Sequence, residues 1–237
     1  MLFDNKISLV IPAHNEEEGL SHLLQEYPGY IDEVVVVDNN STDRTAEVAA
    51  SFGCRVVEEK KQGYGAAFKA GFKAATGDII ITMDADGTCL FEGYWRLIKT
   101  IVDEKVDFIT ARRLPDRFRS FPSLIRFFGD IFLDVACWIF FRFWVYDSQS
   151  GIWTFRKDIL SKINLESNDW AFSEEFKIEA FTHPDINARE LPVLYVNVRL
   201  GDSKLSIWRD GFANLYFIWK KWIEKKKTGK ISPSSQS

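Results

Sequence analysis

Asp84 and Asp86 are the residues with the clearest chemical potential, because one small residue separates them and the apolar run 78–83 precedes them. Two carboxylates just beyond a buried strand can point into one cleft and bind a divalent cation through oxygen, as Mg²⁺ and Mn²⁺ prefer. Such a cation neutralises the charge that develops on a departing diphosphate. An acidic surface turn is the alternative interpretation, which the pair alone leaves open.

Further polar residues follow the other predicted strands. Asn15 and Glu16 come after the first strand, and residues 38–41 come after the second. Ligands of open α/β sheets bind at the carboxyl ends of the strands, so we expect these residues to surround one cleft. Taken singly, each also fits a local role, either in the first turn of a helix or in an Asx-type turn that caps it.

The elements that would position these residues alternate along the chain. Short apolar runs separated by helical stretches indicate βαβ units and a mainly parallel sheet covered on both faces. The expected strands are 6–12, 33–37, 55–58, 78–83 and 106–111, and the expected helices are 16–27, 42–52, 64–75 and 91–103. Beyond residue 111 the alternation fails, and we expect helices at 120–146, 173–182 and 206–227 and strands at 151–155 and 188–198.

Composition limits the class of protein. The 237 residues are 46% hydrophobic, which is enough for one large α/β domain with a core. A net charge of −4 argues against a nucleic-acid partner. Three cysteines without a CxxC pair support neither a disulfide framework nor a zinc site, and they favour a reducing, cytoplasmic compartment. The longest apolar run, 131–146, contains Asp134 and Arg142 and falls short of the roughly 20 residues of a membrane span.

Aromatic residues, 15% of the chain, crowd into segments 118–146 and 208–222. These segments overlap two basic regions: 112–142 has six Arg against three Asp, and 220–237 has six Lys against one Glu. Within 206–227 the apolar residues recur every three or four positions, and Lys220, Lys221 and Lys225–Lys227 lie beside and after this apolar face. The apolar residues are Phe212, Leu215, Tyr216, Trp219, Trp222 and Ile223. This pattern predicts helices at a membrane surface. Core packing, or docking of a small membrane subunit, would leave the same pattern.

Five segments in the same order resemble the family 2 inverting glycosyltransferases of the GT-A fold. The similarity is to the branch with dolichyl-phosphate mannose synthase and the bacterial polyprenyl-phosphate glucosyltransferases, and it covers about residues 7–205. The segments are 12–16 (P-x-Y-N-E in the family), 37–43 (V-D-D-x-S-x-D), 63–67 with Gly71 (G-x-G-x-A), 84–87 (the metal motif) and 199–205 (R-x-G-x-S-K-L).

The resemblance implies a nucleotide diphosphate sugar as donor, and Mg²⁺ or Mn²⁺ held by Asp84 and Asp86. GDP-mannose and UDP-glucose both remain open as donors, because His14, Asn39, Thr88 and Trp153 depart from the family pattern. The residues assigned to the donor site are Pro12, Ala13, His14, Asn15, Glu16, Val37, Asp38, Asn39, Gly65, Asp84, Ala85, Asp86 and Arg113.

The implied acceptor is dolichyl or polyprenyl phosphate. A phosphate monoester is already ionised near neutral pH, so it needs orientation and charge compensation rather than a general base. The residues assigned to the acceptor phosphate are Arg113, Arg126, Arg199, Ser203 and Lys204. Solvated surface charge is the alternative for each of these cations.

The catalytic set implied by the resemblance is Asp86, Asp147, Glu175 and Arg199. In relatives with a sugar acceptor, an acid near Asp147 or Glu175 is the base, whereas here we expect both to position other groups. Two other functions remain open: transfer to a sugar or protein hydroxyl with a general base, and a non-catalytic subunit that binds nucleotide sugar or membrane.

We therefore expect a GT-A domain over 1–205 with an aromatic, basic insertion at about 114–146. An amphipathic helix at 206–228 and a disordered tail at 229–237 would follow. The expected location is the cytosolic face of a membrane, as a peripheral protein.

Overall fold

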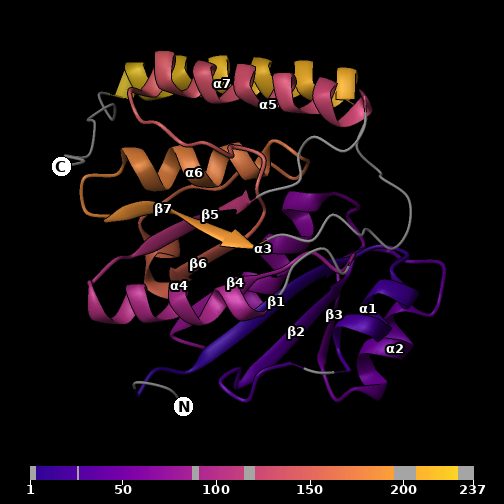
Figure 1. Cartoon of the computed structure of the whole chain (residues 1–237). Helices are drawn as coiled ribbons and strands as arrows, with labels where there is room; N and C mark the ends of the chain where they lie inside the picture. Colours follow the sequence, from indigo (N-terminus) through magenta and orange to yellow (C-terminus); the bar gives the residue numbers. More distant parts are fainter. Residues whose placement is uncertain (1–3, 26, 87–90, 115–120, 195–206, 229–237) are drawn as a thin grey trace.

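A seven-stranded sheet forms the centre of the computed structural model, which describes residues 4–25, 27–86, 91–114, 121–194 and 207–228 (Figure 1). Its strand order is β3-β2-β1-β4-β6-β5-β7. The strands are β1 (Ile7–Ala13), β2 (Glu33–Asp38), β3 (Arg55–Glu58), β4 (Ile79–Thr82), β5 (Phe108–Leu114), β6 (Trp153–Arg156) and β7 (Ala188–Leu194). The predicted mixed, mainly parallel sheet flanked by helices is confirmed.

Strand β6 is the antiparallel member, and it lies between β4 and β5. Ile81 of β4 pairs with Thr154 of β6, so the start of β6 lies beside the end of β4. The loop before β6 therefore reaches the same edge of the sheet as the loop after β4. This arrangement brings Gly151 next to Asp84.

Two layers of helix cover the faces of the sheet. The helices α1 (Glu17–Leu23), α2 (Thr45–Ser51) and α4 (Glu92–Asp103) pack on one face, and α3 (Tyr64–Ala74) and α6 (Phe172–Thr182) pack on the other. A short 3₁₀ helix, Lys157–Ser161, was not expected from the sequence. Each face has its own apolar cluster, as the β-branched runs of the buried strands require.

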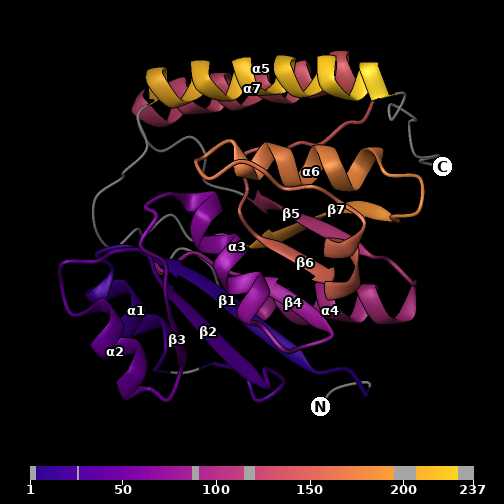
Figure 2. The ribbon, with the colours of Figure 1, turned by 180° about the vertical axis from the view of Figure 1, so that it is seen from behind.

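A third layer lies outside α6 and consists of α5 (Phe121–Phe141) and α7 (Ile207–Thr228), which lie side by side in both views (Figures 1 and 2). The helix expected over 120–146 ends at 141, where Arg142 adopts a positive φ of 63°. Phe143 and Val145 beyond it enter the core. No helix among the described residues combines the length and the apolar character needed to traverse a bilayer.

Helix α6 is buried along its whole length, because the sheet lies below it and α5 and α7 lie above it. Phe172 and Phe176 contact Trp153 with ring centroids 5.9 and 5.1 Å apart. Much of the aromatic excess is therefore core. The buried surface of α6 also contains charged residues, namely Glu174, Glu175, Lys177 and Glu179.

Helix α7 directs lysines inward and aromatic residues outward. Lys221 and Lys225 are buried against α6. Phe212, Tyr216 and Trp219 are 68%, 63% and 45% exposed. Placing Lys221 and Lys225 at the edge of an apolar face was therefore wrong, because α6 presents carboxylates that a sequence pattern of α7 alone does not reveal.

Gly71 allows α3 to approach the sheet closely. A Cβ at this position would lie 2.4 Å from Val10 Cγ1 and 2.9 Å from Val37 Cγ2.

We expect Gly71→Ala to destabilise the protein by about 1–3 kcal/mol through overpacking, although alanine favours a helix by about 1 kcal/mol. Gly29→Ala, with no atom within 4 Å of the new Cβ, is the control for urea unfolding. A stabilised Gly71→Ala variant would contradict this packing.

Candidate active site at the carboxyl edge of the sheet

A cavity of about 420 Å³ opens at the carboxyl ends of β1, β2 and β4. Residues that follow these strands, the start of α3 and the loop before α6 form its walls. They are Pro12, Ala13, His14, Glu16, Asn39, Gln62, Gly63, Tyr64, Ala67, Asp84, Ala85, Asp86, Asp169 and Trp170. Residues predicted from three separate strands therefore meet in one place.

Asn39 holds one wall of the cavity together. Its side-chain amide donates to the carbonyls of Glu59 and Lys61 at 2.9 and 2.8 Å, and its Oδ1 accepts the Gly63 N–H at 2.8 Å. His14 Nδ1 lies 2.9 Å from the Asn39 carbonyl, which can only accept, so Nδ1 donates. His14 Nε2 then accepts from the Gln62 amide at 2.9 Å. This network fixes the plane of the His14 ring against the cavity.

Several residues that were predicted to bind the sugar donor lie behind or beside the cavity and do not line it. Asp38 Oδ1 accepts the Ser41 N–H at 3.1 Å, and Asn15 Oδ1 accepts the Thr42 N–H at 2.7 Å. The first is the turn-forming bond that the sequence left open as an alternative, whereas the second joins the loop after β1 to the loop after β2. Val37 is buried in the core, and Gly65 and Arg113 also lie outside the cavity wall. Of the predicted donor set, Pro12, Ala13, His14, Glu16, Asn39, Asp84, Ala85 and Asp86 line it.

Asp84 and Asp86 lie on the same wall, which fits the donor set of a divalent cation. Their carboxylates would supply the hard oxygen ligands that Mg²⁺ and Mn²⁺ prefer. Asp86 is buried. Asp84 Oδ1 accepts a hydrogen bond from the Tyr64 hydroxyl at 3.3 Å.

Tyr64 and Trp170 form an aromatic wall that sequence analysis missed. Their rings stack with centroids 4.7 Å apart and planes 24° apart. Gln62 and Asp169 were missed as well. Tyr64 lies inside the glycine-rich segment and could have been noticed there, whereas nothing in the sequence links residues 169 and 170 to a strand end more than 80 residues earlier.

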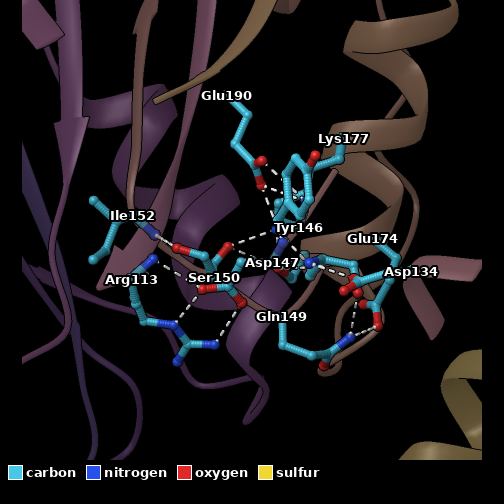
Figure 3. Close-up of polar contacts among 12 residues, drawn as sticks. Arg113, Asp134, Tyr146, Asp147, Gln149, Ser150, Ile152, Glu174, Lys177 and Glu190 are labelled. Atoms are coloured by element: carbon cyan, nitrogen blue, oxygen red, sulfur yellow. Dashed lines mark hydrogen bonds and ion pairs between the residues drawn. The ribbon is translucent and has the colours of Figure 1, made fainter. Parts of the chain in front are cut away.

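Asp147, on the loop before β6, forms an ion pair with Arg113 of β5 (Figure 3). Arg113 Nε and Nη2 each donate to a different carboxylate oxygen of Asp147 at 2.7 Å. Asp147 is 0% exposed, whereas the Arg113 side chain is 25% exposed. A bidentate pair of this kind fixes the orientation of the guanidinium, so Asp147 positions Arg113 and leaves part of it accessible.

The loop around Asp147 is anchored by groups from three elements (Figure 3). Glu190 of β7 accepts the N–H groups of Tyr146 and Asp147 at 2.9 and 3.0 Å. Asp134 of α5 accepts the Ser148 N–H at 2.9 Å. Lys177 of α6 donates to the carbonyls of Ser148 and Ser150, both at 2.6 Å. Burial lowers the pKa of Lys177 to about 8, against the opposing effect of Asp147.

Glu175 faces backbone groups instead of the cavity. Its Oε2 accepts the N–H groups of Glu166 and Ser167 at 3.0 and 2.8 Å, and its Oε1 accepts from Lys221 at 3.0 Å. The remaining predicted residues cannot be placed. Arg199, Ser203 and Lys204 lie outside the described residues, as does the side chain of Arg126 on α5.

An α/β sheet with a polar cavity and paired aspartates at its carboxyl edge is the GT-A architecture. Residues 8–163 match the family described as "Glycosyl transferase family 2". The chain belongs to this family.

Curated relatives extend the match over most of the chain. The low-salt glycan biosynthesis hexosyltransferase Agl6 of Haloferax volcanii is 30% identical over 219 residues, which are 90% of this chain and 52% of that protein. The dolichyl-phosphate hexose transferase of the same organism is 28% identical over 230 residues, 94% of this chain and 96% of that protein. The chain thus spans about half the length of the first of these relatives.

A solved structure shares the fold. Glucosyl-3-phosphoglycerate synthase from Mycobacterium tuberculosis, in complex with Mn²⁺, UDP-glucose and phosphoglyceric acid, superposes with a TM-score of 0.68 at 20% identity, covering 91% of this chain and 80% of that one. At this identity the similarity concerns the fold.

Gly151 brings the loop before β6 against the cavity wall. A Cβ there would lie 1.8 Å from Tyr64 Oη and 3.6 Å from Asp84 Oδ1. We expect Gly151→Ala to lower the free energy of unfolding by about 1–3 kcal/mol.

Tyr64→Phe removes the atom that the new methyl group would meet, so it provides the control. In a double-mutant cycle by urea unfolding, Gly151→Ala should cost less in the Tyr64→Phe background. Equal costs in the two backgrounds would show that Gly151 does not contact Tyr64.

Proposed function

We propose that the protein transfers a hexose from a nucleotide diphosphate sugar to dolichyl or polyprenyl phosphate, with inversion at the anomeric carbon. The observation that carries the proposal is the cavity in which Asp84 and Asp86 face His14, Glu16 and the aromatic wall. Two relatives support dolichyl phosphate as the acceptor by their names. They are the dolichyl-phosphate hexose transferase of H. volcanii and the dolichyl-phosphate beta-glucosyltransferase of Drosophila melanogaster.

The donor occupies the cavity in this proposal. His14 and Glu16 offer polar groups for a base and ribose, and wrong bases are rejected because they leave such groups unpaired. Asp84 and Asp86 would hold Mg²⁺ or Mn²⁺, which when bound neutralises charge on the diphosphate. The Mn²⁺ and UDP-glucose in the M. tuberculosis synthase structure support a divalent cation and a nucleotide sugar. GDP-mannose and UDP-glucose are the donors that we propose to compare.

The acceptor phosphate binds on the side of Arg113. Asp147 fixes the guanidinium of Arg113, whose side chain is 25% exposed and would orient a phosphate oxygen toward the anomeric carbon. An ionised phosphate monoester needs no general base. We propose Arg126, Arg199, Ser203 and Lys204 as further contacts of this phosphate.

A transferase with a hydroxyl acceptor would need a carboxylate that can take a proton from the acceptor. Arg113 occupies both oxygens of the fully buried Asp147. Glu175 is buried too, and it accepts from two backbone N–H groups and Lys221. These environments favour positioning roles for both acids and therefore favour the phosphate acceptor.

We expect the protein with Mn²⁺ and radiolabelled GDP-mannose or UDP-glucose to convert undecaprenyl or dolichyl phosphate into an organic-extractable sugar lipid. EDTA should abolish the product, and Asp86→Asn should reduce kcat/KM by at least about a hundredfold, comparable with the loss of one charge-stabilising group elsewhere. Trp95→Ser, on α4, is the control. Formation of no sugar lipid from either donor would refute the proposal.

The outer layer would hold the protein on the cytosolic surface of a membrane. Its solvent-facing apolar residues, here called the outer aromatic face, are Phe132, Trp138, Ile139, Phe212, Tyr216 and Trp219. Aromatic side chains favour the headgroup region of a bilayer, and the exposed Lys220, Lys226 and Lys227 on α7 suit anionic lipids. A peripheral position there would bring the protein to a lipid-linked acceptor.

Vesicle flotation tests this surface. With anionic vesicles, Phe212→Ser/Tyr216→Ser/Trp219→Ser should weaken binding by at least about tenfold, or 1.4 kcal/mol. The control is Trp95→Ser, which removes an aromatic residue that is 42% exposed on the other side of the sheet. Failure of the unaltered protein to float would instead favour a small membrane subunit as the partner of this face.

A further inference from the structure

Loop 166–170 forms part of the cavity wall although it begins next to α6 and far from the strand ends. Asp169 and Trp170 line the cavity, and Trp170 stacks on Tyr64. The Ala66 N–H donates to the Asn168 carbonyl at 3.0 Å. The loop therefore rests directly on the start of α3.

The contact between this loop and α3 leaves little space. A Cβ at Gly63 would lie 2.3 Å from the Asn168 carbonyl oxygen, and one at Gly65 would lie 2.6 Å from the Ser167 carbonyl oxygen. Because the backbones touch, a small displacement of the loop changes the position of Tyr64 and Trp170 together.

Glu175 holds the loop from the other side. It lies on α6 with its side chain fully buried, and its Oε2 accepts the N–H groups of both Glu166 and Ser167. A carboxylate that accepts two backbone N–H groups makes charge-assisted hydrogen bonds, which are shorter and stronger than neutral ones. The strength of this support depends on Glu175 keeping its charge.

Lys221 of α7 is the cation that faces this carboxylate. Its Nζ lies 3.0 Å from Glu175 Oε1 and 3.1 Å from Glu179 Oε1, and its side chain is buried. Burial acts to lower the pKa of Lys221, but the attraction of Glu175 and Glu179 outweighs it and raises the pKa above its usual value. Removing one partner of a buried pair leaves an uncompensated charge.

We propose that Lys221 is a positioning residue for the donor cavity, acting through Glu175 to hold loop 166–170 and its Trp170 against Tyr64. Helix α7 contributes none of the described residues that line the cavity. Binding of a nucleotide diphosphate nevertheless depends on α7, because the cavity wall is tied to it. The part of this inference that concerns nucleotides rests on the proposed function, whereas the part that concerns the loop does not.

Lys225 provides a matched control within the same helix. Its Nζ lies 2.9 Å from Glu179 Oε2, and its side chain is buried as that of Lys221 is. Glu179 lies one turn along α6 from Glu175, away from the two N–H groups that Glu175 accepts. Lys225→Met thus removes a buried ion pair between the same two helices without removing the partner of Glu175.

The first experiment measures amide hydrogen exchange in the full chain without nucleotide. In Lys221→Met we expect faster exchange at residues 166 and 167 than in the unaltered protein, while Lys225→Met leaves these two amides protected. Lys221→Arg, which keeps the charge, should restore protection. Unchanged protection in Lys221→Met, or equal loss in Lys225→Met, would overturn the proposal.

The second experiment measures binding of UDP and of GDP in the presence of MnCl₂ by calorimetry. We expect Lys221→Met to weaken binding by about 2- to 30-fold, the range of couplings transmitted through packed networks. Lys225→Met should bind as the unaltered protein does, and Lys221→Arg should recover the affinity. In turnover the donor KM should rise more than the KM of the acceptor.

The two measurements separate the inference from the function on which it rests. If the unaltered protein binds neither nucleotide, the proposed function fails, and the exchange data still decide whether Lys221 holds the loop. If Lys221→Met does not fold, Lys221→Gln, which keeps a hydrogen-bond donor of similar length, is measured in its place. If Lys221→Met exposes the loop to exchange but binds UDP and GDP with normal affinity, only the part of the inference that concerns nucleotides is refuted.

Discussion

Burial of α6 on all sides is the constraint on which the rest of the structure depends, because the charged residues of this helix need partners in a dry environment. Glu175 pairs with loop 166–167 and Lys221, Lys177 with the carbonyls of Ser148 and Ser150, and Glu179 with Lys221 and Lys225. These pairings tie α6 to three segments, namely loop 166–167, loop 148–150 and helix α7. One helix thus sets the positions of the loop of Asp147, the wall of the donor cavity and the outer helices. Buried ion pairs add little net stability compared with apolar packing, so we infer that their main effect is to specify this arrangement.

The antiparallel strand β6 gives the site its second half. A chain of purely parallel strands would bring only the loops that follow strands to the carboxyl edge, among them the loops that contain His14, Asn39 and the two aspartates. Because β6 runs the other way, the loop that precedes it arrives at the same edge. The absence of a side chain at Gly151 lets this loop touch Tyr64. The same loop therefore contains Asp147, which fixes Arg113, and Gly151, which lies against Tyr64.

The sequence predicted the features that depend on local pattern. Apolar, β-branched runs predicted strands β1 to β4 to within one or two residues. The residues at and after the ends of these strands, taken with the family motifs, include eight of the fourteen residues that line the cavity. The family resemblance assigned Val37 to the donor site, and in the structure its side chain is buried in the core. The sequence could not foresee Trp170, because that residue reaches the cavity through contacts of its loop with α3 and α6. The inward direction of Lys221 was hidden for the same reason, since its carboxylate partners belong to another helix.

Helix α7 has two faces with opposite requirements. Asn214, Ile218, Lys221 and Lys225 recur at helical spacing and are buried, whereas Phe212, Tyr216 and Trp219 recur at the same spacing and are exposed. In water alone, such a helix would gain more by turning its aromatic residues inward and its lysines outward, since apolar burial contributes about 25 cal/mol per Å². The observed orientation is favourable under two conditions. Carboxylates must pair with the lysines on the inner side, as Glu175 and Glu179 do, and the outer side must contact an apolar medium. The structure contains the first of these conditions, and the proposed membrane surface supplies the second. Both conditions act on the same helix, so Lys221, which helps to orient its aromatic face, is also the residue proposed to tie it to the donor cavity.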